Sequence, residues 1–202
     1  RQIACRPVIE CSDAADDALA DGSAMLRRPF SLAGRRDGAD GVELSIIHRV
    51  VGVGTEWLSR LKVGDAVNIL GPLGNRFAMP PPDSMAILVG GGVGIPPMLY
   101  LAGQLAGRRA VAFAGAMSND LLPLDVRQAG GDALAPSMCI GEFARHGIAS
   151  IISTDDGSAG FRGFVTEALE RYLDHTTPAK RATIYACGPE GMLKRIADIA
   201  KA

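Results

Sequence analysis

The chain has 202 residues, 48% of them hydrophobic and 21% charged, with a formal net charge of −1. This composition is typical of a globular protein, and a near-neutral chain offers no basic field for nucleic acid, so we expect no nucleic-acid partner. No apolar run is long enough to cross a bilayer and no secretory signal is visible, so we expect no membrane partner.

The first 79 residues have the pattern of a β-rich domain. Residues 42–51 alternate in part and are rich in β-branched side chains, and residues 66–70 form a second β-type run that ends at Gly71-Pro72. Between them, residues 55–61 are predicted to form a short helix capped by Thr55. We therefore assign residues 1–79 to a β-rich domain.

A proline-rich segment follows, and then strands alternate with helices. Successive prolines predict that residues 80–84 form a stiff, extended linker. The alternation predicts a doubly wound, parallel α/β domain over residues 85–202. The predicted strands are 85–89, 110–115, 148–153 and 182–187, and the predicted helices are 96–106, 119–128, 164–174 and 189–201. Residues 129–147 are not assigned.

A glycine run, Gly90 to Gly94, lies between the first of these strands and its helix. Such a turn presents backbone N–H groups at a helix N-terminus, where a pyrophosphate can bind without a side chain. The spacing departs from G-x-G-x-x-G, because Pro97 stands where the third glycine would be. Binding of a dinucleotide and a purely structural turn both remain open.

Two segments of the β-rich half are candidate anion sites. In residues 27–31, Arg28 suits a phosphate, Phe30 suits a flat ring and Ser31 can hydrogen-bond ring heteroatoms; the alternative is a surface strand with a buried phenylalanine. In residues 52–55, backbone N–H groups and the Thr55 hydroxyl could hold a second anion; the alternative is simple helix capping.

Further candidates follow the later strands. Cys187 ends the last strand, and the polar residues 154–158 follow the third, so both should reach the edge where ligands bind in open parallel sheets. A lone cysteine is more often an inert buried side chain. The histidines share no ligand spacing, which gives zinc and acyl-transfer chemistry no support. The four cysteines, Cys5, Cys11, Cys139 and Cys187, form no C-x-x-C pair, which favours a reducing, cytoplasmic location.

Taken in order, these motifs resemble the ferredoxin–NADP reductase superfamily. The resemblance rests on residues 28–31, Gly54-Thr55, residues 90–97 and Cys187-Gly188-Pro189, and it covers roughly residues 25–202. Residues 155–166 and 71–74 are most similar to the electron-transfer subunits of bacterial dihydroorotate dehydrogenase complexes.

The resemblance implies an antiparallel, FAD-binding β-barrel followed by a nicotinamide-nucleotide domain. It implies that Arg28 meets the FAD pyrophosphate, that Cys187 sits beside the nicotinamide, and that hydride passes from NADH to FAD, which then releases single electrons. Flavin contacts are implied for Pro29, Phe30, Ser31, Ile47, His48, Arg49, Gly54 and Thr55, and nucleotide contacts for Gly91, Gly92, Val93, Gly94, Ile95, Pro96, Asp155, Gly188 and Pro189.

Charge predicts that the nucleotide is NADH. A 2′-phosphate calls for an arginine or lysine after the second strand of the nucleotide domain. That region, residues 115–120, contains no base and one acid, Asp120, while Arg108 and Arg109 precede the strand. NADH is therefore expected over NADPH.

The chain also departs from the family pattern. We count about four of the six strands expected of the barrel. Members of the family carry a C-terminal [2Fe–2S] segment, and the given sequence shows no such segment after Cys187. We therefore expect no metal site in this chain. A cluster is expected only if the protein has a cysteine segment that is missing from the given sequence. The expected partner is an FMN-containing dihydroorotate dehydrogenase subunit in a hetero-oligomer of pyrimidine biosynthesis. The alternatives are a reductase subunit for a hydrogenase or ferredoxin, and a nucleotide-binding module without electron transfer.

Overall fold

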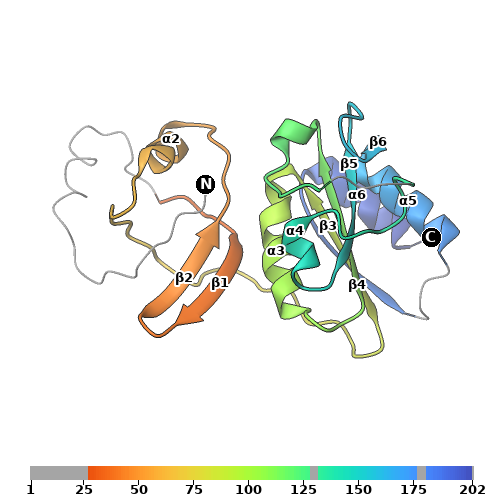
Figure 1. Ribbon diagram of the computed structural model, residues 1–202, viewed down its shortest axis with the longest axis horizontal. Helices are drawn as coiled ribbons and strands as arrows, with labels where there is room; N and C mark the ends of the chain where they lie inside the picture. Colours follow the sequence, from red (N-terminus) through yellow and green to blue (C-terminus); the bar gives the residue numbers. More distant parts are fainter. Residues whose placement is uncertain (1–26, 128–131, 177–180, 202) are drawn as a thin grey trace. The chain divides into compact units, whose positions relative to one another are not determined.

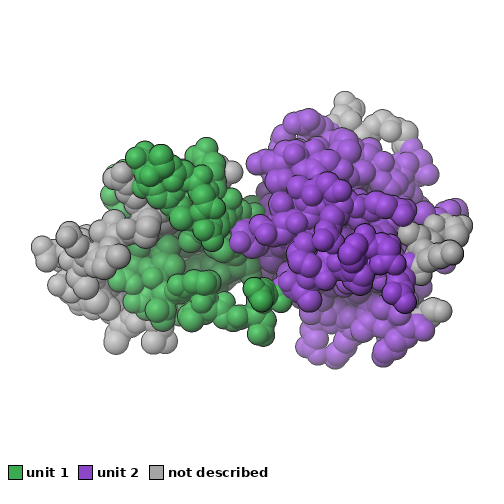
Figure 2. Space-filling model, turned by 90° about the horizontal axis from the view of Figure 1, so that it is seen from below, with its two compact units in different colours: residues 1–76 green, residues 77–202 purple. Residues whose placement is uncertain are grey.

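The computed structural model describes residues 27–127, 132–176 and 181–201. The chain divides into two compact units, Arg1–Arg76 and Phe77–Ala202, which are coloured separately in Figure 2. Cys5 and Cys11 lie outside the described residues. None of the helices in the described ranges is long and apolar enough to cross a membrane.

Unit 1 contains an antiparallel pair of strands and one helix (Figure 1). Strand β1, Leu32–Gly38, pairs with β2, Gly41–Ile46. The prediction of a strand over residues 66–70 is wrong: Ile69 and Leu70 are 55% and 65% exposed, and the described part of unit 1 gives them no strand partner. The small antiparallel sheet agrees with a β-rich unit, while its closure into a barrel stays a prediction.

The helix of unit 1 begins earlier than its sequence suggested. Helix α2 spans Val53–Arg60, and its N-cap is Gly52 rather than Thr55. The hydroxyl of Thr55 accepts hydrogen bonds from the N–H groups of Val51 (2.9 Å) and Gly52 (3.1 Å) and donates one to the Gly52 carbonyl (2.9 Å). Thr55 therefore ties the first turn back onto the chain that leads into it.

Unit 2 is built on a five-stranded parallel sheet with the order β6-β5-β4-β3-β7, which confirms the predicted parallel sheet. The strands are β3 Met85–Gly91, β4 Ala110–Ala116, β5 Ala149–Thr154, β6 Phe161–Arg162 and β7 Ala182–Cys187. The long helices are α3 Ile95–Gln104, α5 Val165–His175 and α6 Glu190–Ile199. Short helical turns complete the unit: η1 Gly92–Gly94, η2 Asn119–Leu121 and α4 Gly141–Ala144.

Helices cover both faces of this sheet (Figure 1), as expected of strands that are buried on both sides. Ile87 and Val89 of β3 share one core with Val165 and Leu169 of α5 and with Ile196 of α6. The residue between those two, Leu88, is buried as well and points to the opposite face, which α3 covers.

Two predictions for unit 2 need correction. The helix expected over 119–128 is only the turn η2, because Pro123 disfavours helical geometry at the residue before it. The segment predicted as an extended linker contains a turn, in which the Ser84 N–H donates to the Pro81 carbonyl (3.0 Å). It also packs on unit 2, since Arg108 donates to the carbonyl of Pro80 (2.9 Å).

Candidate functional site

The strand order of unit 2 reverses between β3 and β7. The chain winds outward from β3 through β4 and β5, and then returns to place β7 on the other side of β3. A reversal of this kind opens a crevice at the carboxyl ends of the two strands, where ligands of open α/β sheets bind. Gly90 lies opposite Cys187 in the register, so the glycine run and the Cys187–Pro189 segment lie side by side at this point.

The glycines there allow backbone to pack against backbone. A Cβ on Gly94 would lie 1.9 Å from the carbonyl oxygen of Cys187 and 2.7 Å from the nitrogen of Gly188. A Cβ on Gly90 would lie 2.9 Å from the Cα of Ile95, the first residue of α3. The close helix–strand approach is thus made at Gly90 and Gly94, which explains why Pro97 can replace the third glycine.

The turn itself is suited to an anion. Gly92 has φ +55, in the left-handed region that favours glycine, and it carries the chain from β3 into α3. Helix α3 begins at Ile95, and Pro96 falls in its first turn, where a missing N–H interrupts no helical hydrogen bond. The N-terminus of a ten-residue helix therefore faces the crevice.

Cys187 is half-buried, and burial raises the pKa of its thiol. Because desolvation disfavours the charged form, this side chain is a neutral thiol at physiological pH. Its strand is held by Tyr185, whose hydroxyl donates to the Ala78 carbonyl (2.7 Å) and whose ring meets Phe77 edge-on at 5.7 Å. Burial also raises the pKa of Tyr185, so its hydroxyl stays a donor.

The loop after β5 is held rigid from within. The Thr154 hydroxyl accepts the N–H of Ala159 (2.9 Å) and donates to the carbonyl of the same residue (2.8 Å). The Asp156 carboxylate accepts the N–H and hydroxyl of Ser158, and these hydrogen bonds lower its pKa. Gly160 has φ +64, and a Cβ there would lie 2.2 Å from the Ile152 carbonyl oxygen.

This loop is also bonded to the last residue of β4 and to the segment that follows it. The N–H of Asp155 donates to the Ala116 carbonyl (3.1 Å), and the N–H of Asn119 donates to the Ser158 hydroxyl (2.8 Å). Burial, followed by the charges of Asp156 and Glu167, raises the pKa of Asp155. The structure thus brings two acidic residues next to residues 115–120. The lack of an arginine or lysine in that segment is the observation that predicted NADH.

In unit 1, predicted flavin residues meet in pairs. A Cβ on Gly54 would lie 2.6 Å from Nε of Arg28, so the guanidinium rests where only a glycine leaves room. The rings of Phe30 and His48 meet edge-on, with centroids 6.0 Å apart and planes at 73°. Nδ1 of His48 is buried and has no hydrogen-bond partner among the residues that the structure describes. Pro29 and Ser31 are exposed beside this pair, Ile47 and Arg49 flank His48, and all of them lie outside β1 and β2.

No family model matches the chain, but similar proteins do. The dihydroorotate dehydrogenase B (NAD(+)) electron transfer subunit of Desulforamulus reducens is 36% identical over 179 residues, covering 87% of this chain and 60% of that protein. The Geobacillus kaustophilus subunit of the same name is 38% identical over 182 residues, covering 89% and 62%. This chain is homologous to those electron transfer subunits. It spans about 60% of the length of these relatives.

Solved structures agree with this homology. The NADH-dependent reduced ferredoxin-NADP oxidoreductase is 28% identical with a TM-score of 0.62, and the match covers 87% of this chain and 56% of that one. The Amycolatopsis cytochrome P450 reductase is 27% identical with a TM-score of 0.61, covering 87% and 52%. The predicted resemblance to ferredoxin–NADP reductases is therefore confirmed.

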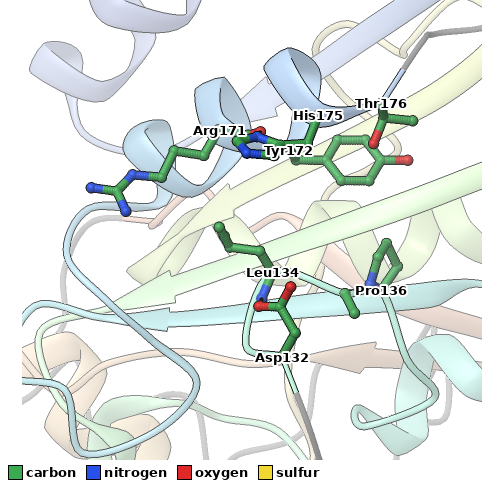
Figure 3. A pocket seen from close by; sticks show the side chains of 8 residues that line it. Asp132, Leu134, Pro136, Arg171, Tyr172, His175 and Thr176 are labelled. Atoms are coloured by element: carbon green, nitrogen blue, oxygen red, sulfur yellow. Dashed lines mark hydrogen bonds between the residues drawn. The ribbon is translucent and has the colours of Figure 1, made fainter.

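One cavity of unit 2 lies away from the glycine run. Its volume is about 250 Å³, and Figure 3 shows its lining side chains, which include Asp132, Arg171, Tyr172 and His175. It lies where α5 ends and where Ser137 pairs with the start of β5, toward the amino ends of the strands. The glycine run is at the carboxyl ends, so this cavity is not part of the candidate nucleotide site.

One residue at the crevice was missed by sequence reasoning. The side chain of Met192, on α6, lies against both Gly91 and Gly188. Its position three residues after Pro189 carries no chemical signal by itself. Among the described residues, no three His, Cys, Asp or Glu side chains converge on a point that could hold a metal ion.

Proposed function

We propose that this chain oxidises NADH through FAD, as part of an electron-transfer subunit that serves a dihydroorotate dehydrogenase. The observation that carries the proposal is the backbone contact of Gly94 with Cys187 at the sheet's point of reversal, which joins a pyrophosphate turn to a thiol. The homologous subunits named for dihydroorotate dehydrogenase B support the choice of partner. That partner would carry FMN and form a hetero-oligomer with this subunit.

Residues Gly91–Pro96 would hold the NADH pyrophosphate. The backbone N–H groups of the glycine turn would donate to its oxygens, because Pro96 and Pro97 have none and the N–H of Ile95 bonds to the Gly92 carbonyl. The glycines of the turn would let the phosphates approach. Cys187 would lie beside the nicotinamide, where a neutral thiol can pack against the ring without adding a charge. Gly188 and Pro189 would line the nicotinamide site together with Cys187.

Electrostatics favours NADH over NADPH at this site. The backbones of Asp155 and Asp156 are bonded to Ala116, the last residue of β4, and to Met117, which follows it. A ribose 2′-phosphate would lie at this end of β4, and the two carboxylates would repel it. Arg162 packs across Gly157 and supplies one positive charge against these two carboxylates. The negative charges outnumber the positive one, so this site should prefer NADH, which carries a 2′-hydroxyl, over NADPH.

The described residues of unit 1 fit a flavin. The space over Gly54 holds the Arg28 guanidinium, which pairs well with a diphosphate, and the orphaned Nδ1 of His48 beside Phe30 is suited to a ring heteroatom. Pro29, Ser31, Ile47 and Arg49 would complete the isoalloxazine wall. Thr55 would contribute its backbone N–H, since its hydroxyl already donates to Gly52. The hydride and single-electron chemistry would be supplied by bound FAD.

The experiment that tests the proposal combines spectroscopy with co-purification. The protein reconstituted with FAD should show a flavin spectrum that NADH bleaches faster than NADPH does. A subunit containing FMN should co-purify, and dihydroorotate should then reduce NAD⁺ through the complex. A protein that takes up no FAD would contradict electron transfer. Reduction of an added ferredoxin without such a partner would favour the second candidate, a ferredoxin reductase, which the 28% identical oxidoreductase supports.

Replacing Cys187 by alanine should slow hydride transfer more than it weakens NADH binding. We expect the rate of flavin reduction at saturating NADH to fall about tenfold, because the nicotinamide loses a wall that orients it. Stopped-flow absorbance gives the rate, and titration gives the dissociation constant. Cys139→Ser is the control, because Cys139 is buried against Ser150 and faces no part of the crevice. Equal rates for Cys187→Ala and wild type would refute the placement.

Replacing Gly54 by alanine should weaken flavin binding without weakening the fold. The new methyl group would displace Arg28, a flexible side chain, and losing its charge-assisted hydrogen bonds would cost about tenfold in FAD affinity. Equilibrium dialysis or flavin fluorescence measures the affinity. Gly52→Ala is a matched control, since its backbone is extended and nothing lies within 4 Å of its Cβ position. Equal FAD affinity in the two variants would contradict the role of Arg28.

A further inference from the structure

We propose that Met192 is a positioning residue that sets the spacing between the pyrophosphate turn and the Cys187–Pro189 segment; the catalytic part of this inference rests on the proposed function. A Cβ on Gly91 would lie 2.6 Å from Sδ of Met192. A Cβ on Gly188 would lie 2.5 Å from Cε and 2.9 Å from Sδ of the same side chain. The thioether thus fills the space that two glycines leave empty.

The two glycines are themselves in contact. The Cβ position of Gly188 is 3.3 Å from the Cα of Gly91, and on the neighbouring turn the Cβ position of Gly94 is 2.7 Å from the nitrogen of Gly188. The two backbone segments therefore contact each other directly. Because the contacting residues are glycines, neither has a side chain that would fix the distance between the segments. Met192 supplies the missing bulk from a third element, α6.

Helix α6 gives this side chain a fixed base. Met192 also packs against the core that the sheet shares with α5 and α6. Arg195, one turn later, donates to the carboxylate of Glu170 on α5 at 2.7 and 2.8 Å. An unbranched, polarisable thioether adapts well to an irregular space of this kind. We infer that the helix transmits its position through Met192 to both segments that the nucleotide would touch.

The position of Met192 distinguishes it from its neighbour Leu193. Leu193 is 39% exposed on the same turn of α6, and no glycine of the crevice has it among its nearest atoms. Truncation of either residue removes an apolar side chain of similar size from α6. Only truncation at Met192 opens a hollow between Gly91 and Gly188, so Leu193→Ala is the matched control.

The test compares Met192→Ala, Met192→Leu and Leu193→Ala in the FAD-loaded protein and without added nucleotide. For Met192→Ala we expect both the KM for NADH to rise and the rate of flavin reduction to fall, each about tenfold, since small displacements of a reacting geometry are costly. Met192→Leu, which restores the bulk, should recover most of both. Without nucleotide, amide hydrogen exchange of residues 90–94, 187 and 188 should accelerate in Met192→Ala and stay at the wild-type rate in Leu193→Ala.

The outcomes separate this inference from the proposed function. If the wild type does not oxidise NADH, the proposed function fails and the exchange measurement still decides the structural role of Met192. If Met192→Ala reacts and exchanges as the wild type does, the inference about Met192 is overturned while the function stands. Should Met192→Ala also exchange rapidly across β4 and β5, Met192→Val, which removes the thioether but keeps part of the apolar volume, replaces it under the same two criteria.

Discussion

Replacing Gly94 by alanine is expected to reduce NADH-dependent flavin reduction by about 100-fold or more, because a small displacement at a reacting site has effects of this size. The new Cβ would lie 1.9 Å from the carbonyl oxygen of Cys187. The oxygen belongs to the backbone and the backbone fixes the position of the Cβ, so no side-chain rotation relieves the clash. The pyrophosphate turn and the thiol segment must therefore separate. Titration with NADH should show weakened binding, and stopped-flow absorbance should show slow reduction.

The control for Gly94→Ala is Gly191→Ala. Gly191 lies in the first turn of α6 with nothing within 4 Å of its Cβ position, so alanine there should change stability by no more than about 0.5 kcal/mol and leave NADH oxidation unchanged. Thermal unfolding followed by circular dichroism measures the first effect. Wild-type kinetics in Gly94→Ala would show that the close contact of these two segments has no part in nucleotide binding.

The sequence was sufficient to predict the parallel sheet and the point where ligands should gather. Strands such as β3 and β4 are buried on both faces and contain almost nothing but apolar residues and glycine, which makes them visible as short continuous runs. Gly90–Gly94 and Cys187 were placed on one edge by the parallel topology alone. The reversal of strand order makes β3 and β7 neighbours, and their register places Gly90 opposite Cys187.

Predictions failed where the outcome depended on contacts between distant segments. The short strand β6, Phe161–Arg162, exists only because it pairs with Ser153 and Thr154 of β5. Residues 66–70 have a β-type composition, but composition does not supply a pairing partner. At Thr55, local capping chemistry was recognised, yet the hydroxyl bonds backward to Gly52 from inside the helix.

The candidate site, too, could be predicted from the sequence only in part. Single residues such as Arg28, Gly54 and Cys187 stood out by type and order along the chain. The pairing of Arg28 with Gly54 and the contact of Met192 with two glycines needed the fold, since a glycine in the sequence does not tell which side chain fills the space beside it. The hydrogen bond from the N–H of Asp156 to the carbonyl of Met117 likewise joins two loops that the sequence separates.

Replacing Phe113 by alanine should destabilise unit 2 by about 3–5 kcal/mol, the usual cost of removing a buried aromatic ring. Phe113 is 1% exposed, lies between Val89 and Ile151 in the sheet, and meets the ring of Tyr172 edge-on at 5.4 Å. Denaturant unfolding followed by circular dichroism, which is dominated by the helices of unit 2, should show the loss as a shift to lower midpoint.

Two features of the chain make the Phe113 measurement specific. Phe164 is 61% exposed, so Phe164→Ala removes the same ring from the surface of the same unit and should change stability by no more than about 0.5 kcal/mol. The sequence has one tryptophan, Trp57, which lies in α2 of unit 1, so its fluorescence reports that unit separately. In Phe113→Ala the tryptophan transition should move less than the circular dichroism transition, because the cavity opens within the core of unit 2 alone. Equal destabilisation by Phe113→Ala and Phe164→Ala would mean that the ring between β4 and α5 does not hold the nucleotide unit together.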